Sequence, residues 1–186
     1  MRLVGERGLE RVTVEQLADA AEVSTRTFFN YFSSKEEALV GHDPEDGARL
    51  REAVIARPPG EAPLRALHAV LRERLREAGR ERDRWLTRRA LVRSLVDSEP
   101  RLLAAWVAAW ASFEQALVEG VASRLGVDPE RDLYPRLVAG VAVAATRTAV
   151  VHWNGGSTAR LGELVDDAFR SLGEGLAAPA GEGGRP

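Results

Sequence analysis

Apolar side chains recur three and four positions apart through almost the whole chain, which is the spacing of one face of an α-helix. No segment shows the sustained alternation of apolar and polar residues that is typical of a half-buried strand. We therefore expect an all-α protein. The segments with a helical period cover residues 13–21, 24–32, 34–40, 43–56, 63–78, 81–96, 100–125, 132–153 and 158–172.

Capping residues predict where several of these helices begin and end. Thr13-Val-Glu-Gln16 and Ser34-Lys-Glu-Glu37 both have the capping-box pattern, in which each end of the tetrapeptide binds a backbone amide of the other. Asp43-Pro44 supplies an N-cap and a proline at the first helical position. The glycines at 79 and 126 are expected to end the helices that precede them.

The chain divides into three expected parts. Residues 1–42 hold the shortest helices and residues 43–174 the longer ones. Residues 175–186 are rich in Gly and Pro and are expected to form a disordered tail. The run Arg57-Pro58-Pro59-Gly60 is a rigid connector and a further candidate boundary inside the second part.

Two short helices joined by a tight turn, within residues 13–32, predict a helix-turn-helix. The second helix of that motif enters the major groove, and its first residues reach the base edges. Phe28 and Phe32 lie four apart and are expected to pin this helix to its own core; Tyr31, taken alone, also fits a core position. Lys35, at the start of the next helix, is expected to hold a phosphate. The expected DNA-contacting residues are Thr13, Ser24, Thr25, Arg26, Thr27, Phe29, Asn30, Tyr31 and Lys35.

The run GLERVTVEQLADAAEVSTRTFFNYFSSKEEAL, from Gly8 to Leu39, resembles the TetR family of bacterial transcriptional regulators. The resemblance implies a homodimeric repressor with an N-terminal DNA reader and a C-terminal helical domain that binds a small-molecule effector and dimerises. Its DNA partner would be a pseudo-palindromic double-stranded operator. The run RTFFNYF-SSKEEAL is similar to the corresponding sequence of an actinobacterial subgroup that senses acyl-CoA-like ligands. This resemblance implies an apolar or acyl-type effector. The positions that carry the resemblance are Gly8, Thr13-Val14, Leu17-Ala18, Ala21, Val23-Ser24, the aromatic residues flanking Asn30, and Ser34-Lys35-Glu36.

Three features depart from the family pattern. Met1 falls inside the family's first helix, so the resemblance implies a truncated first helix here. Phe29 stands where the family often has a tyrosine whose hydroxyl binds phosphate. Glu22 occupies a turn position often given to glycine, where a positive φ would cost about 1 kcal/mol. A second interpretation therefore stays open, in which the chain is a helical small-molecule-binding or interaction module with a compromised DNA reader.

Composition excludes several classes of function. The chain has no cysteine, which excludes a disulfide scaffold, a thiolate zinc site and a cysteine nucleophile. Its three histidines are too far apart in sequence for a metal pair on one helical face, so neither a metal nor a cofactor is expected. No Ser/His/Asp set, paired carboxylates in an apolar context or glycine-rich phosphate loop stands out, and we do not expect an enzyme. The net charge of -2 does not indicate a nucleic-acid binder by itself. With no long apolar run and no signal-peptide pattern, we expect a cytoplasmic protein without a membrane partner.

Aromatic residues of the segment 100–125 form a stripe that suggests an effector pocket in the bundle, although this spacing is first of all typical of a core face. His68 is more typical of a core or boundary histidine than of a ligand contact. Arg147 fits an anion anchor, an intersubunit pair or a surface arginine. The expected pocket residues are His68, Trp85, Trp106, Trp110, Phe113 and Arg147.

The last two helical segments, 132–153 and 158–174, are expected to pair with their symmetry mates in a four-helix interface. The first carries small residues that allow a close approach. The second offers more apolar surface than one thin terminal helix can bury against its own domain. The expected interface residues are Val143, Leu161, Leu164, Val165, Ala168, Phe169 and Leu172.

Overall fold

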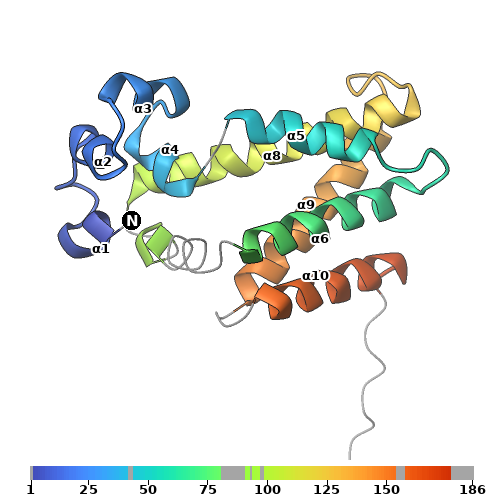
Figure 1. Ribbon diagram of the computed structural model, residues 1–186. Helices are drawn as coiled ribbons and strands as arrows, with labels where there is room; N and C mark the ends of the chain where they lie inside the picture. Colours follow the sequence, from blue (N-terminus) through green and yellow to red (C-terminus); the bar gives the residue numbers. More distant parts are fainter. Residues whose placement is uncertain are drawn as a thin grey trace, which may run out of the picture.

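The computed structural model describes residues 2–41, 44–80, 91–92, 94–96, 99–153 and 158–176. Within these ranges the chain forms helices and turns without a strand, so the expected all-α fold is confirmed (Figure 1). No helix among them is long and apolar enough to cross a bilayer. The helices are α1 (Arg2–Arg7), α2 (Val14–Ala20), α3 (Thr25–Tyr31), α4 (Lys35–Val40), α5 (Pro44–Ile55), α6 (Pro63–Arg80), α8 (Pro100–Leu125), α9 (Leu133–His152) and α10 (Thr158–Gly173).

The four short helices α1 to α4 gather at one end of the molecule, around the beginning of α8 (Figure 1). Their apolar core joins α1, the turn that follows it, α4 and α8, and it buries Val4, Leu9, Val12, Leu39 and Leu102. Leu102 lies in the first turn of α8, so the long helix is part of this small core as well. We call residues 2–41 the reader.

The other helices form a bundle in which α8 packs against α5 and α9, and α10 covers α6 and α9 (Figure 1). Its core draws on all five helices and includes Val54, Leu67, Leu117, Val143 and Leu161. A Cβ at position 120 would lie 2.8 Å from the Val54 Cβ, so the close crossing of α5 and α8 requires the glycine there. Because α8 contributes to both cores, it is the rigid element that links the bundle to the reader.

The predicted helix ends are largely those of the structure. Thr13 and Gln16 form the expected capping box, Asp132 caps α9, and Gly126 ends α8 with a φ of 67°. The expected stop at Gly79 is wrong, because α6 continues through it to Arg80. The segment predicted helical over 81–96 lies outside the described residues apart from 91–92 and 94–96, as do the proposed cap at Asp43 and the tail beyond Leu176.

Candidate functional site

The start of α3 is fixed by hydrogen bonds within the sequence Ser24-Thr25-Arg26-Thr27. Ser24 is the N-cap, and its Oγ accepts a hydrogen bond of 3.0 Å from the amide of Thr27. The hydroxyls of Ser24 and Thr27 are also 2.8 Å apart. These bonds hold the first turn of the helix in one geometry, which leaves the Arg26 side chain to project from a defined backbone.

The side chains of α3 separate into a buried and an exposed face. Phe28 is buried and its ring lies 5.5 Å from that of Phe32, which confirms the expected anchoring of the helix. Arg26, Phe29 and Asn30 are exposed, and at 100° per residue they share one face. α3 carries no acidic residue. This face therefore combines a guanidinium, an amide and an exposed aromatic ring, which suits contact with base edges and phosphates.

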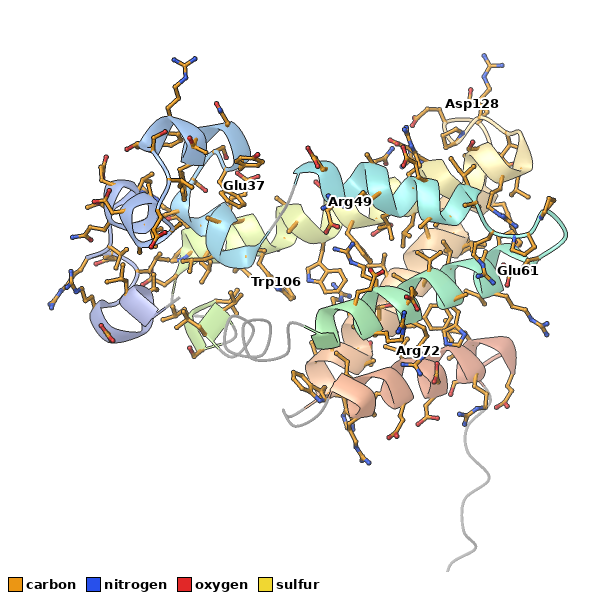
Figure 2. All side chains as sticks on the ribbon, in the orientation of Figure 1. Glu37, Arg49, Glu61, Arg72, Trp106 and Asp128 are labelled. Carbon is orange, nitrogen blue, oxygen red and sulfur yellow. The ribbon has the colours of Figure 1, made fainter. Side chains whose placement is uncertain are left out.

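Lys35 has a different environment from the one predicted. Its Nζ donates to the carbonyls of Leu9, at 2.8 Å, and Val12, at 3.0 Å, and so ties α4 to the turn between α1 and α2. An ammonium has three N–H donors, so a phosphate contact can use only the third. The carboxylate of Glu37 adds a negative charge at the same helix start, where it accepts from the amide and hydroxyl of Ser33 (Figure 2). The capping box expected at Ser34 is therefore only half formed, because Glu37 binds Ser33 instead of the Ser34 amide.

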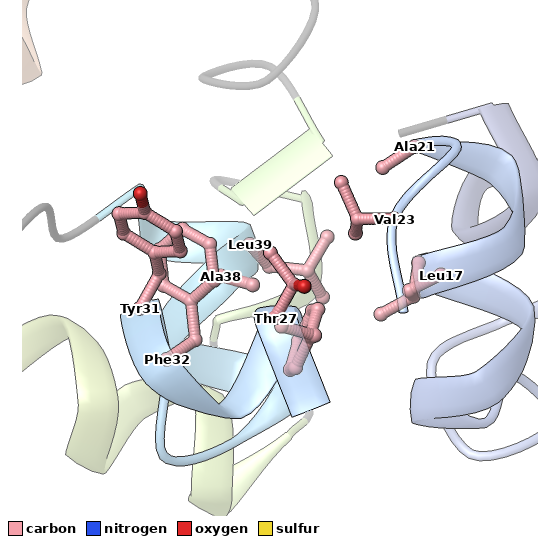
Figure 3. Close-up of a pocket in the computed structure, with 9 residues that line it drawn as sticks. Leu17, Ala21, Val23, Thr27, Tyr31, Phe32, Ala38 and Leu39 are labelled. Carbon is pink, nitrogen blue, oxygen red and sulfur yellow. The ribbon is translucent and has the colours of Figure 1, made fainter. Parts of the chain in front are cut away.

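An apolar cleft of about 300 Å³ opens between α2, α3 and α4 (Figure 3). Thr27 and Tyr31 of α3 line it, opposite Leu17 of α2 and Ala21, which follows α2. Tyr31 is 53% exposed, so the interpretation of this residue as a core side chain is wrong. The remaining lining residues are Val23, Phe28, Phe32, Ala38 and Leu39.

Glu22, in the turn between α2 and α3, has a φ of 56°. This is the left-handed region predicted for the position, where a side chain is strained and glycine is not. We expect Glu22→Gly to raise the free energy of unfolding by about 0.5–1 kcal/mol. Thermal unfolding followed by circular dichroism measures the change, and Glu15→Gly, in the first turn of α2, serves as a control that should destabilise instead. A loss of stability in Glu22→Gly would contradict the strain argument.

The aromatic residues predicted to wall a pocket form a continuous row along α8. Trp106 and Trp110 meet edge to face with centroids 6.0 Å apart, and Trp110 meets Phe113 in the same way at 5.6 Å. Trp110 and Phe113 are half-buried against the bundle core. Trp106, one turn nearer the beginning of α8, is half-buried as well.

The other three expected pocket residues behave differently. His68 is half-buried, with its Nε2 2.7 Å from the Asp166 carboxylate and its ring stacked on Phe169 at 4.6 Å, so it joins α6 to α10 as a boundary histidine. Arg147 is on the exposed side of α9, which excludes it from a pocket wall within the bundle. Trp85 lies outside the described residues.

Comparison with known proteins explains this combination of a small helix-turn-helix unit and a helical bundle. The model of bacterial regulatory proteins of the tetR family matches residues 1–40, and that of the MftR C-terminal domain matches residues 61–177. The chain belongs to the TetR family of transcriptional regulators. Neither its families nor the relatives described below are enzymes, in agreement with the absence of a predicted catalytic set.

Individual TetR-type proteins are similar over most of the chain. The regulator TcmR of Streptomyces glaucescens is 40% identical over 154 residues, which are 79% of this chain and 66% of that protein. The mycofactocin biosynthesis regulator MftR of Mycobacterium tuberculosis, itself a putative assignment, is 27% identical over 95% of this chain and 86% of its own. Thermus thermophilus FadR, a TetR family repressor solved in complex with lauroyl-CoA, superposes with a TM-score of 0.55 at 25% identity, covering 100% of this chain and 95% of FadR.

The residues predicted for a TetR-type dimer interface are only partly available on the surface. Val143, Leu161, Val165 and Phe169 are buried in the core of their own bundle, so they have no surface left for a symmetry mate and this part of the prediction is wrong. Leu164, Ala168 and Leu172 are half-buried and keep some exposed area.

An apolar surface that the sequence analysis missed lies on α9. Leu133, Leu137 and Val151 are 74%, 54% and 56% exposed. With 100° per residue these three fall on the same side of the helix as the smaller residues Gly140, Val141, Ala144 and Thr148, and we call this set the α9 face. The spacing was visible in the sequence, but α9 is apolar on both sides, and the pattern alone does not say which side the bundle covers.

Proposed function

We propose that this TetR family regulator is a dimeric repressor that an apolar or acyl-type effector releases from a double-stranded, pseudo-palindromic operator. The observation that carries the proposal is the α3 face of Arg26, Phe29 and Asn30, exposed on a helix whose start is capped and whose other side is anchored by Phe28. Two such helices, one from each protomer, would enter successive major grooves about 34 Å apart.

The effector part of the proposal is supported by the bundle and by a structural relative. The row of Trp106, Trp110 and Phe113 supplies flat apolar surface next to α6. FadR, whose fold superposes on this chain, was solved with lauroyl-CoA. An effector can bind more tightly to a state in which the two readers are a different distance apart. It then lowers the affinity for the operator by at most the ratio of its own affinities for the two states.

The α9 face supports the dimer. In an antiparallel pair of α9 helices, Leu133 of one protomer would lie near Val151 of the other, and Leu137 near Thr148, with Gly140 and Ala144 at the centre. The small residues at the centre allow a close approach, and Arg136 and Arg147 would line one polar edge. Half-exposed Leu164, Ala168 and Leu172 of α10 would extend the contact. Such an interface is isologous, as a two-fold symmetric operator requires.

The test of the DNA-binding part is operator binding by Arg26→Ala. If Arg26 reads a guanine, the substitution should weaken operator binding by about 1–3 kcal/mol and relax the preference at one base position. A fluorescence-anisotropy titration against operator variants measures both effects. Arg131→Ala is a matched control with the same charge change, because Arg131 is 89% exposed in the turn between α8 and α9. Unchanged affinity in Arg26→Ala would remove Arg26 from the interface, and no binding by the parent protein would overturn the repressor.

A further inference from the structure

Arg74 of α6 stands between the start of α5 and the aromatic row of α8. Its Nη1 donates to Asp46 Oδ1 at 2.6 Å and its Nη2 to Asp46 Oδ2, so the two groups form a bidentate pair. The guanidinium carbon also lies 5.8 Å from the centroid of the Phe113 ring. Three helices, α5, α6 and α8, therefore meet at one cation.

The position of Asp46 connects this pair to the reader. Asp46 lies in the first turn of α5, which begins shortly after Gly41 ends the last helix of the reader. α5 packs extensively on α8 and much less on α6. The Arg74–Asp46 pair is therefore a polar tie that holds the beginning of α5 to α6, at the place where the chain leaves the reader.

The chemistry of Arg74 suits a ligand that has a negative charge and a flat or extended apolar body. A carboxylate on the ligand would repeat the bidentate geometry that Asp46 now provides, and Phe113 with Trp110 would contact the apolar part. Asp46 would not be left without a cation, because its Oδ1 lies 3.7 Å from Nη2 of Arg49. Exchange of one carboxylate for another at Arg74 thus keeps the charges paired.

We propose that Arg74 is the anion-recognising residue of the effector site, and that the anionic group of an effector displaces Asp46 from it. The displacement frees the first turn of α5 from α6 and so transmits binding to the reader. This inference rests on the proposed effector-controlled function, and it names the chemical class of the effector: an apolar molecule with a carboxylate or similar anion.

Two dyes that share an apolar body but differ in charge test the proposal. 8-Anilinonaphthalene-1-sulfonate carries an anion and N-phenyl-1-naphthylamine does not. Exciting the dyes through tryptophan favours dye bound near the bundle, because all four tryptophans follow residue 80 and the reader has none. We expect Arg74→Gln to weaken binding of the anionic dye by about tenfold and to change the affinity for the neutral dye by less than twofold.

Asp46→Asn removes the competing carboxylate and should strengthen binding of the anionic dye by about threefold or more, with the neutral dye unchanged. Arg76→Gln is the matched control, since Arg76 is an exposed arginine of the same helix paired with Glu73. Equal changes for both dyes in Arg74→Gln, or weaker anionic binding in Asp46→Asn, would show that the pair is only structural and overturn the inference.

The same titrations distinguish a failure of the inference from a failure of the function. In one outcome, both dyes bind the protein and cause it to dissociate from the operator, while Arg74→Gln changes the affinity for both dyes equally. In that case the effector site stands and the role proposed for Arg74 is wrong. If neither dye binds the parent protein near its tryptophans, the effector site itself fails, and the inference fails with it.

Discussion

Leu137→Arg is expected to convert the protein into a monomer that no longer binds its operator at concentrations where the parent does. Leu137 is 54% exposed on the α9 face, one turn from its central residue Gly140. An arginine there would bring two unpaired guanidinium groups into an apolar contact, at a cost of several kcal/mol. Once the dimer is lost, each reader binds separately, and operator affinity should fall by about 100-fold or more.

Sedimentation velocity and operator titration on the same samples measure the two effects together. The parent should sediment as a dimer of about 41 kDa, twice the 20.3 kDa of the chain, at micromolar concentration. Ile55→Arg provides the control, because Ile55 is an exposed apolar residue on a different helix, at the end of α5. A monomeric parent protein would overturn the dimer, and a dimeric Leu137→Arg variant would place the interface elsewhere.

The positions of the helices could be predicted because their ends depend on local interactions. Thr13, Ser24 and Asp132 bind amides within three residues of themselves, so the sequence contains both partners of each bond. Gly126 takes a left-handed conformation that glycine adopts at low cost. Gly79 shows the limit of this reasoning, because glycine permits a helix end but does not require one, and α6 continues through it to Arg80.

The faces of the helices were harder to predict than their ends. α10 has one apolar stripe, and Leu161, Val165 and Phe169 use it inside their own bundle instead of in a dimer. Periodicity shows that an apolar face must be covered, but it does not identify the covering element. On α9 small residues lie on both sides: Ala139, Ala142 and Ala145 are buried, whereas Gly140 and Ala144 share the exposed side with Leu133 and Leu137. The presence of small residues therefore does not identify the side of the helix that is free for a partner.

Contacts between distant segments could not be predicted from one sequence. Lys35 was placed at a phosphate because it starts a helix, whereas its Nζ binds carbonyls that lie more than twenty residues earlier. The Arg74–Asp46 pair joins α6 to α5 in the same manner. No local pattern distinguishes Arg74 from the other arginines of α6, so the fold had to be known before its role could be inferred.

Arg124→Met is expected to lower the free energy of unfolding by about 2–4 kcal/mol, the largest stability effect of a single polar side chain that we predict. Arg124, near the end of α8, donates to the carbonyls of Val54, Arg57, Pro58 and Glu61, with distances of 2.6–3.3 Å. These carbonyls belong to the end of α5 and the connector to α6, so one guanidinium fixes the path of the chain between the two helices.

An ion pair supports the same connector from within. Arg57 donates two hydrogen bonds to the Glu61 carboxylate, which lowers the pKa of Glu61, and the charge of Arg124 acts in the same direction. Methionine at 124 would keep most of the side-chain volume but leave the carbonyls to water and remove that charge. The loss is therefore one of hydrogen bonds and electrostatics more than of packing.

Urea unfolding at a fixed protein concentration measures the effect, since dimerisation would otherwise contribute to the apparent stability. Arg131→Met is the matched control: Arg131 is 89% exposed, lies 3.6 Å from Asp128, and should change the free energy by less than about 0.5 kcal/mol. Arg124→Lys should fall between the parent and Arg124→Met, because an ammonium keeps the charge but cannot span four carbonyls at once. Equal stability of Arg124→Met and Arg131→Met would show that the connector between α5 and α6 holds its path without the guanidinium.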